Sequence, residues 1–283
     1  MLRRHDVGEA DRVLTLYSPW RGKFRAIAKG VRRPKSRLGG HVELFTHVNL
    51  LVAQGRNLDI VTQAQAIRPF ARLRDDLWKA AYACYAAELV DRFTEEHLEN
   101  QPIFDLLLQI LAFLDELGVW PDAAGNGSVR EAGEAGSAVE LSLRNFELRL
   151  LGALGYAPEL FHCVQCGQRL VPGDNRFSAS GGGVLCAACG VTHPGARVLS
   201  DNAIKAMRLM SGEPFGVFRR LRLPAAPALE IEGALRAHIN FILERQLRTA
   251  EFLDRMKAGR QRERRPAPGA RAAPGETVAV ASG

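Results

Sequence analysis

Residues 13–31 read VLTLYSPWRGKFRAIAKGV, two β-leaning runs joined by a turn that contains both proline and glycine. The first run is Val13–Tyr17, and Ser18–Gly22 ends it, because proline and glycine interrupt regular structure. The second run, Phe24–Val31, largely alternates apolar and polar residues, as a half-buried strand does. The segment therefore predicts two strands connected by a tight turn.

Two more β-leaning runs lie at residues 42–52 and 58–67. The segment Gln54–Asn57 between them contains glycine and asparagine and predicts a hairpin turn. Several short strands with tight turns are typical of a small barrel. We therefore expect a barrel such as an OB-fold over residues 1–70.

The hydrophobic period changes after residue 70. Apolar residues spaced by three or four predict amphipathic helices over residues 73–98, 101–117, 139–154, 202–211 and 229–256. Residues 122–138 are rich in glycine, alanine and serine, and predict a flexible loop. The expected fold class is α+β, with an all-α helical domain in two parts after the barrel. Those parts are residues 71–157 and 201–256.

The most specific pattern lies between the two helical parts, in residues 158–200. Two Cys-x-x-Cys pairs are separated by nineteen residues, and their members are Cys163, Cys166, Cys186 and Cys189. This spacing matches a zinc ribbon, in which the intervening hairpin brings four thiolates to one tetrahedron. Two disulfides are disfavoured by a reducing cytosol, and four unrelated thiols are disfavoured by the spacing. We expect one structural zinc ion, because four protein ligands leave no position for a catalytic water.

Three further metal-binding or thiol side chains have simpler interpretations. His162 and His193 flank the cysteine pairs and are spare candidates for zinc, but four cysteines already suffice. Cys84 lies alone on the apolar side of a predicted helix, where we expect a buried core residue.

Basic residues are concentrated at the two ends of the chain. The formal net charge is +7, of which residues 1–37 carry +8 and residues 255–283 carry +5, so residues 38–254 carry −6. This asymmetry favours a localised surface for a polyanion, either a nucleic acid or an anionic membrane. From Lys257 the chain is rich in arginine, proline and glycine, and predicts a disordered basic tail over residues 257–283.

No membrane or export signal is visible. The start, Met1–Asp6, has no apolar run behind it. No stretch approaches the ~18–20 apolar residues of a membrane span. We therefore expect a cytoplasmic protein with no membrane partner.

The densest basic segment, residues 29–40, is expected to form a loop, since Pro34 and its glycines disfavour regular structure. Its cations, and those on the preceding turn and strand, are Lys29, Arg32, Arg33, Lys35, Arg37, Arg21, Lys23 and Arg25. Trp20 and Phe24 are interleaved with them, and cations with aromatic rings are typical of single-strand binding on a small barrel. A solvated loop is the alternative for the cations, and a core position is the alternative for both rings.

No catalytic constellation is visible. There is no phosphate-binding glycine loop of the P-loop type. Three carboxylates near the N-terminus, Asp6, Glu9 and Asp11, could hold a metal, but carboxylates beside so many arginines are more often partners in surface ion pairs. We expect a protein that is not an enzyme.

Several groups of residues together resemble one known family, the bacterial DNA repair protein RecO. The N-terminal groups are GEADR at 8–12, RGK at 21–23 and AKGVRRPKSRLG at 28–39. The helical groups are Asp75-Asp76-Leu77, Ala81-Tyr82, Glu88-Leu89, Phe104–Leu107 and Phe146–Leu151, with Leu154-Gly155-Tyr156 and Pro158 leading into Cys163. The similarity covers about residues 1–255. The chain starts where the family has several more residues of the first strand, so either the start codon is misassigned or the first strand is truncated. A truncated strand would leave an unpaired edge of the barrel.

The resemblance implies an N-terminal OB-fold, a helical domain and a zinc-ribbon-like insertion. It also implies a recombination mediator that binds single- and double-stranded DNA, promotes annealing, and works with RecR to load RecA onto DNA coated by single-strand-binding protein. Such a protein works at the nucleoid. Arg12, within the first matching group, joins the basic residues expected to contact DNA.

Two other functions stay open. One is a protein–protein adaptor, which would work through the acidic helical domain and leave the basic ends incidental. The other is a hydrolase or nuclease acting on DNA, which would need a base, a nucleophile or an open metal site that the sequence does not show.

Overall fold

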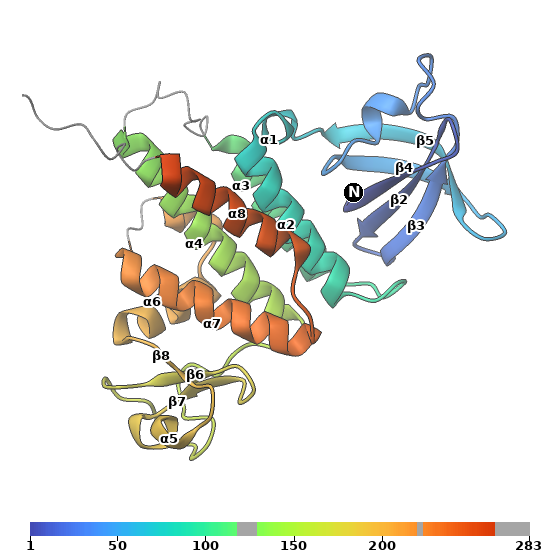
Figure 1. Ribbon diagram of the computed structural model, residues 1–283. Helices are drawn as coiled ribbons and strands as arrows, with labels where there is room; N and C mark the ends of the chain where they lie inside the picture. The colour runs from blue at the N-terminus through green and yellow to red at the C-terminus, as the bar shows by residue number, and fades with distance from the viewer. Residues whose placement is uncertain (118–128, 220–222, 264–283) are drawn as a thin grey trace, which may run out of the picture.

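The computed structural model describes residues 1–117, 129–219 and 223–263. Figure 1 shows a small barrel at the N-terminus, a bundle of helices beside it, and a separate small module at the far end of the bundle. The barrel strands are β1 (Arg3–Val7), β2 (Asp11–Ser18), β3 (Gly22–Ala28), β4 (His47–Ala53) and β5 (Asp59–Arg68).

The five strands form one sheet in the order β1-β2-β3-β5-β4. All neighbouring pairs are antiparallel except β3 and β5, which are parallel. This is the connectivity of a partly open, OB-like barrel. The edge strands β1 and β4 do not pair, but the backbone of Met1 exchanges hydrogen bonds with Phe45 and Thr46, just before β4. The predicted barrel is therefore present, with a first strand of five residues.

Alternation along the strands creates the barrel core. Leu14 and Leu16 of β2 and Phe24, Ala26 and Ala28 of β3 are buried together. The intervening residues of β3, among them Arg25, point to the other face of the sheet. This opposite face of β1–β3 lies toward the helices.

The helices that follow form the main hydrophobic core. They are α1 (Ala71–Arg74), α2 (Leu77–Phe93), α3 (Gln101–Glu116), α4 (Val129–Ala153), α6 (Asp201–Gly212), α7 (Ala225–Leu243) and α8 (Arg248–Glu263). Two 3-10 turns accompany the regular elements: η1 (Gly39–His41) between β3 and β4, and η2 (Phe215–Arg219) between α6 and α7. Polar side chains cap three of them at the N-terminus: Asp76, Asn100 and Ser200 accept hydrogen bonds from backbone N–H groups of α2, α3 and α6. In the described part of the chain, no helix is both long and apolar enough to cross a membrane.

Two sequence predictions about helix boundaries were wrong. The segment 122–138 was expected to be a loop, but α4 already begins at Val129. Its alanine and glutamate residues favour helix strongly enough to offset the two glycines. Residues 118–128 lie outside the described part.

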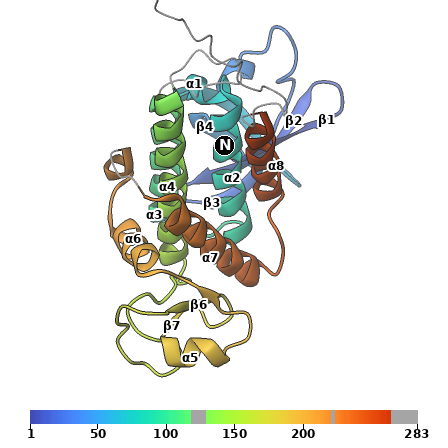
Figure 2. The same ribbon diagram turned by 60° about the vertical axis from the view of Figure 1, so that its left-hand side comes forward.

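The predicted single helix over residues 229–256 is also interrupted. Glu244 has a left-handed backbone conformation, with φ of 52°, and ends α7. The chain turns back so that α8 packs along α2, as both views show (Figures 1 and 2). There Glu88 accepts hydrogen bonds from the backbone N–H and hydroxyl of Thr249, at 2.9 and 2.6 Å. Helix α8 then continues to Glu263, so the prediction of a disordered tail from Lys257 was wrong for residues 257–263. Residues 264–283 lie outside the described part.

The small module connects α4 to α6. It contains a three-stranded sheet in the order β7-β6-β8, made of β6 (Arg176–Ser178), β7 (Gly183–Leu185) and β8 (Arg197–Val198), and the short helix α5 (Ala187–Thr192). Buried His238 of α7 lies 3.0 Å from the carbonyl oxygen of Tyr156 and 3.4 Å from that of Ala179. The module therefore has a fixed attachment to the helices.

Candidate metal centre and nucleic-acid interface

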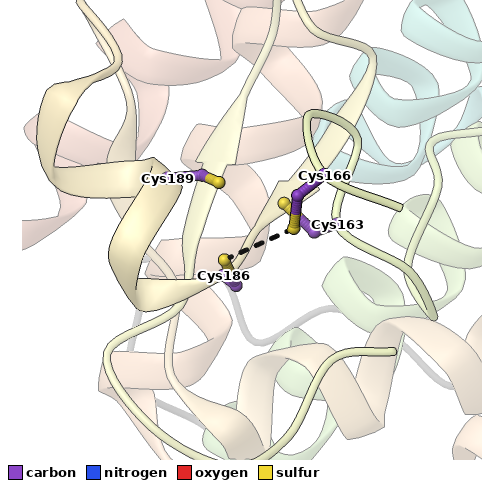
Figure 3. A group of neighbouring side chains, drawn as sticks. All are labelled: Cys163, Cys166, Cys186 and Cys189. Carbon is purple, nitrogen blue, oxygen red and sulfur yellow. Dashed lines mark hydrogen bonds between the residues drawn. The ribbon is translucent and has the colours of Figure 1, made fainter. Parts of the chain in front are cut away.

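The four cysteines converge in the module. Their Sγ atoms all lie within 4.8 Å of one another, and those of Cys166 and Cys186 are 3.9 Å apart (Figure 3). The first pair sits on a turn and the second at the start of α5, with Cys186 as its N-cap residue, and in each pair a glycine N–H donates back to the first cysteine. Gly167 donates to the carbonyl of Cys163 and Gly190 to that of Cys186, both at 2.8 Å. Gly167 has φ of +72°, a conformation that favours glycine.

The sulfur geometry fits a tetrahedral metal ion. Four sulfurs at about 2.3 Å from a zinc ion would be about 3.8 Å apart, close to the observed separation of Cys166 and Cys186. Burial raises the pKa of the Cys163 thiol, but backbone N–H groups of Cys166 and Cys186 outweigh it and lower that pKa to about 6. The neighbouring thiol of Cys186 instead raises the pKa of Cys189 to about 12. Four thiolates at this spacing need a cation to offset their repulsion.

The two nearby histidines are turned to other partners. His162 lies 3.7 Å from the carboxylate of Glu159, and His193 lies 3.1 Å from the carbonyl of Pro194. Among the described residues, the only group of cysteine, histidine and carboxylate side chains placed to hold a metal ion is the four cysteines. Cys84 is partly buried against the helical core, and burial raises its pKa.

The basic segment forms a compact loop after β3. Turn hydrogen bonds join Arg33 to Gly30 and Ser36 to Arg33, at 3.1 and 2.9 Å. The carboxylate of Asp11 accepts from the N–H of Gly30 at 2.7 Å, and this ties the loop to the turn between β1 and β2. The loop is thus a folded projection at one end of the barrel.

The nine basic residues predicted to bind DNA fall into two groups. Five of them form ion pairs: Arg12 with Asp6 and Glu43, Arg21 with Asp59, Lys23 with Asp91, Arg25 with Glu96, and Arg32 with Asp6. The other four are exposed and form no ion pair with any residue that the structure describes: Lys29, Arg33, Lys35 and Arg37. The unpaired positive charge is concentrated on the loop.

Lys23 has the most restricted position of the nine. Its Nζ lies 3.3 Å from the Asp91 carboxylate and donates to the Asp91 carbonyl as well, and its side chain is only 12% exposed. The backbone carbonyl of Lys23 also accepts from the N–H of His97 at 2.8 Å. The structure therefore places this lysine at the contact between the barrel and α2.

The two aromatic residues differ. Trp20 projects from the turn between β2 and β3 and is 82% exposed, whereas Phe24 is buried in the barrel core. The guanidinium of Arg21 lies 4.7 Å from the centre of the Phe24 ring. Trp20 is available for stacking, and Phe24 has the core position that was its alternative.

Two of the three carboxylates near the N-terminus, Asp6 and Asp11, are bound by other groups of the protein. The hydrogen bond from Arg12 lowers the pKa of Asp6, with a further contribution from Arg32. Asp11 anchors the basic loop through its hydrogen bond with Gly30. The sequence does not reveal this role, because the two residues are 19 positions apart.

Two family models match this chain. The model described as Recombination protein O N terminal matches residues 1–70, and the one described as Recombination protein O C terminal matches residues 74–125 and 129–251. The chain belongs to the RecO family. This confirms the resemblance seen in the sequence, and it makes the chain a DNA repair protein.

Curated RecO proteins align over nearly the whole length of the chain. DNA repair protein RecO of Roseiflexus sp. (strain RS-1) is 43% identical over 254 residues, which are 90% of this chain and 83% of that protein. DNA repair protein RecO of Symbiobacterium thermophilum is 37% identical over 266 residues, 92% of this chain and 96% of that protein. That of Dehalococcoides mccartyi (strain CBDB1) is 35% identical over 257 residues, 91% and 94% respectively.

Proposed function

We propose that this RecO protein is a recombination mediator that binds single- and double-stranded DNA without catalysing a reaction. In this proposal it promotes annealing and, together with RecR, loads RecA onto DNA coated by single-strand-binding protein. Its place of action is the cytoplasm, at the nucleoid. The observation that carries the DNA-binding step is the set of four exposed cations on the basic loop of the barrel that form no ion pair with a described residue.

Phosphate contacts by these cations would release counterions from DNA, which makes binding strongly salt-dependent and only weakly sequence-dependent. Lys29, Arg33, Lys35 and Arg37 need not break an ion pair with any described residue before they contact phosphate. The paired cations, Arg12, Arg21, Lys23, Arg25 and Arg32, are further proposed contacts, to be reached by exchange of their carboxylate partners. Trp20 is exposed enough to stack on a base.

We propose zinc as the ion of the cysteine cluster, with a structural role. Four thiolates would complete its coordination sphere, and a soft sulfur set suits zinc. The metal module at residues 158–200 would then brace the two helical parts, 71–157 and 201–256, while residues 1–70 bind DNA.

The test is salt-titrated binding to labelled single- and double-stranded oligonucleotides. For a single strand, each phosphate contact contributes about 0.7 to the steepness of log affinity plotted against log salt concentration. The variant Lys29→Gln/Arg33→Gln/Lys35→Gln/Arg37→Gln should therefore make this plot less steep by about 3. A control with four exposed cations neutralised elsewhere is Arg72→Gln/Arg169→Gln/Arg248→Gln/Arg255→Gln, and it should keep the wild-type slope. Equal slopes for the two variants would refute the assignment of the loop.

Partner binding needs a separate measurement. Pull-downs with RecR and with single-strand-binding protein, run with nuclease present, should retain both partners. Retention of the partners by a protein that shows no DNA affinity at low salt would favour a protein–protein adaptor instead.

A further inference from the structure

A second cationic surface lies where the barrel meets the helices. It is a cleft of about 310 Å³ between the outer face of β1–β3, the C-terminal end of α2 and the connection from α7 to α8. In Figure 1 this junction is where the C-terminal end of α2 approaches the barrel, with the connection from α7 to α8 on the other side of α2. The cations that line it come from all of these elements: Arg3, Lys23, Arg25, Arg92 and Arg245.

The carboxylates in the cleft do not neutralise these cations. Only Asp91 and Glu96 line it, against five basic residues. Asp91 already forms an ion pair with Lys23, whose side chain is 12% exposed. Asp91 also lies 3.7 Å from Arg3, whose side chain is 62% exposed. Arg245 is exposed and has no ion pair with a described residue.

Two of the remaining cations can turn toward an incoming anion at little cost. The pair of Arg25 and Glu96 is about half exposed on both sides, and exposed ion pairs are weak. Within the described ranges, the ion pair that the Arg3 side chain forms is the long one with Asp91, at 3.7 Å. With Arg245, three cations from three separate segments therefore face one polar space.

The lining indicates the class of ligand. No hydrophobic side chain of the described residues lines the cleft, so it offers no apolar anchor for a peptide. The cleft is linked to the basic loop through β3, because Arg25 lies on the outer face of this strand, which ends at Ala28, one residue before Lys29 of the loop. The four residues from Arg25 to Lys29 span about 13 Å of extended chain, a distance that one DNA strand readily bridges.

We propose that the junction cleft is a phosphate-binding subsite for single-stranded DNA, in which Arg245, with Arg3 and Arg25, holds the backbone of a strand that continues from the basic loop. This rests on the proposed DNA-binding function and extends it onto the helical domain. The strand crosses the outer face of β3, so that one DNA molecule contacts both parts of the protein.

The test is fluorescence anisotropy with labelled oligothymidylates of increasing length, from about 4 to about 16 nucleotides, the range of sites on such barrels. Wild type should bind longer strands more tightly, because only those reach from the basic loop to the cleft. The variant Arg245→Gln should bind the shortest strands as wild type does, and should not show this increase in affinity on the longest ones. On those its salt slope should fall by about 0.7, the value for one lost phosphate contact. The matched control is Arg255→Gln, another exposed arginine of the same region that does not line the cleft, and it should behave as wild type at every length.

The outcomes separate this inference from the one on which it rests. Equal behaviour of Arg245→Gln and Arg255→Gln at all lengths, with binding lost in the four-residue loop variant, overturns the subsite alone. Wild-type binding by the loop variant overturns the proposed loop site, and the subsite falls with it. A polyglutamate peptide that binds wild type but not Arg245→Gln, with DNA affinity unchanged in the variant, would assign the cleft to an acidic protein partner and overturn the proposal.

Discussion

Replacement of Gly22 by alanine should loosen the contact between the barrel and the helices. Gly22 begins β3 with φ of +60°, and a Cβ built on it would lie 1.9 Å from the carbonyl oxygen of Leu98. That oxygen belongs to the segment between α2 and α3, which also donates the N–H of His97 to the carbonyl of Lys23 at 2.8 Å. The alanine would therefore push apart two backbones that are now joined by a hydrogen bond.

The magnitude follows from two separable contributions. A left-handed conformation costs a non-glycine residue about 1–2 kcal/mol. Displacement of the 94–99 segment adds the lost hydrogen bond, about 0.5–1.5 kcal/mol, and the lost packing around it. We expect Gly22→Ala to lower the free energy of unfolding by about 3 kcal/mol.

Gly8 provides the matched control. Its φ is +57°, but nothing lies within 4 Å of a Cβ placed on it, so Gly8→Ala should lose only the first contribution, about 1–2 kcal/mol. Urea unfolding followed by circular dichroism measures both losses, and amide exchange at His97 reports the local opening. Equal destabilisation by the two variants, with His97 equally protected, would refute the idea that the close approach at Gly22 fixes the barrel to the helices.

Three other changes test the interior and the metal module. Arg144→Met removes the arginine that pairs with the fully buried carboxylate of Glu147 at 2.9 Å and leaves that carboxylate the hydrogen bond from the Tyr85 hydroxyl, so urea unfolding should show a loss of about 3–5 kcal/mol. Part of this loss should be recovered when Glu147→Leu is added, because the Tyr85 hydroxyl then loses its acceptor. Cys166→Ser should reduce zinc from about one ion per chain in elemental analysis and increase amide exchange in β6 and β7, with the barrel unaffected. Backbone N–H groups of Phe161 and His162 hold the pKa of Glu159 below its usual value. The stabilising contribution of this carboxylate is therefore present above about pH 4.5 and is lost as the pH falls through the lowered pKa. Melting curves recorded over a pH series should show this loss of stability in acid for wild type and not for Glu159→Gln.

The parts of the fold that were predictable are those that depend on near neighbours in the sequence. The alternation around Phe24 and the turn at Ser18–Gly22 locate the ends of β2 and β3 to within three residues, because a strand's period and its turn residues are local properties. The spacing of the four cysteines predicted their convergence for the same reason. Each pair closes a turn of only a few residues, and the hairpin between the pairs is short.

The break between α7 and α8 had no such local signal. Neither glycine nor proline stands at Glu244, and the apolar spacing continues through it from Ile239 to Leu253. What stabilises the break is tertiary: α8 turns back onto α2, where Glu88 binds Thr249, a residue 161 positions away. Pairings at that separation are not visible in a hydrophobic period.

The same limit explains why the charge pattern gave only part of the nucleic-acid surface. Residues 1–37 carry a net charge of +8, and their arginines and lysines look equivalent in the sequence. Folding brings carboxylates from outside this segment to several of them, among them Asp59 to Arg21, Asp91 to Lys23 and Glu96 to Arg25. The predicted DNA-binding cations that form no ion pair with a described residue therefore all lie on the loop, a shorter stretch than the basic segment of the sequence.

Folding also brings together cations from a part of the sequence that is acidic overall. Arg92 and Arg245 belong to the segment whose net charge is −6, yet both line the cleft beside β3. A polyanion responds to the local arrangement of cations within about a Debye length, roughly 8–10 Å, and not to the net charge of a stretch of chain. An acidic helical domain is therefore compatible with the proposed DNA path across this junction, and the cluster of cations on which that proposal rests depends on how the barrel packs against α2 and the α7–α8 connection.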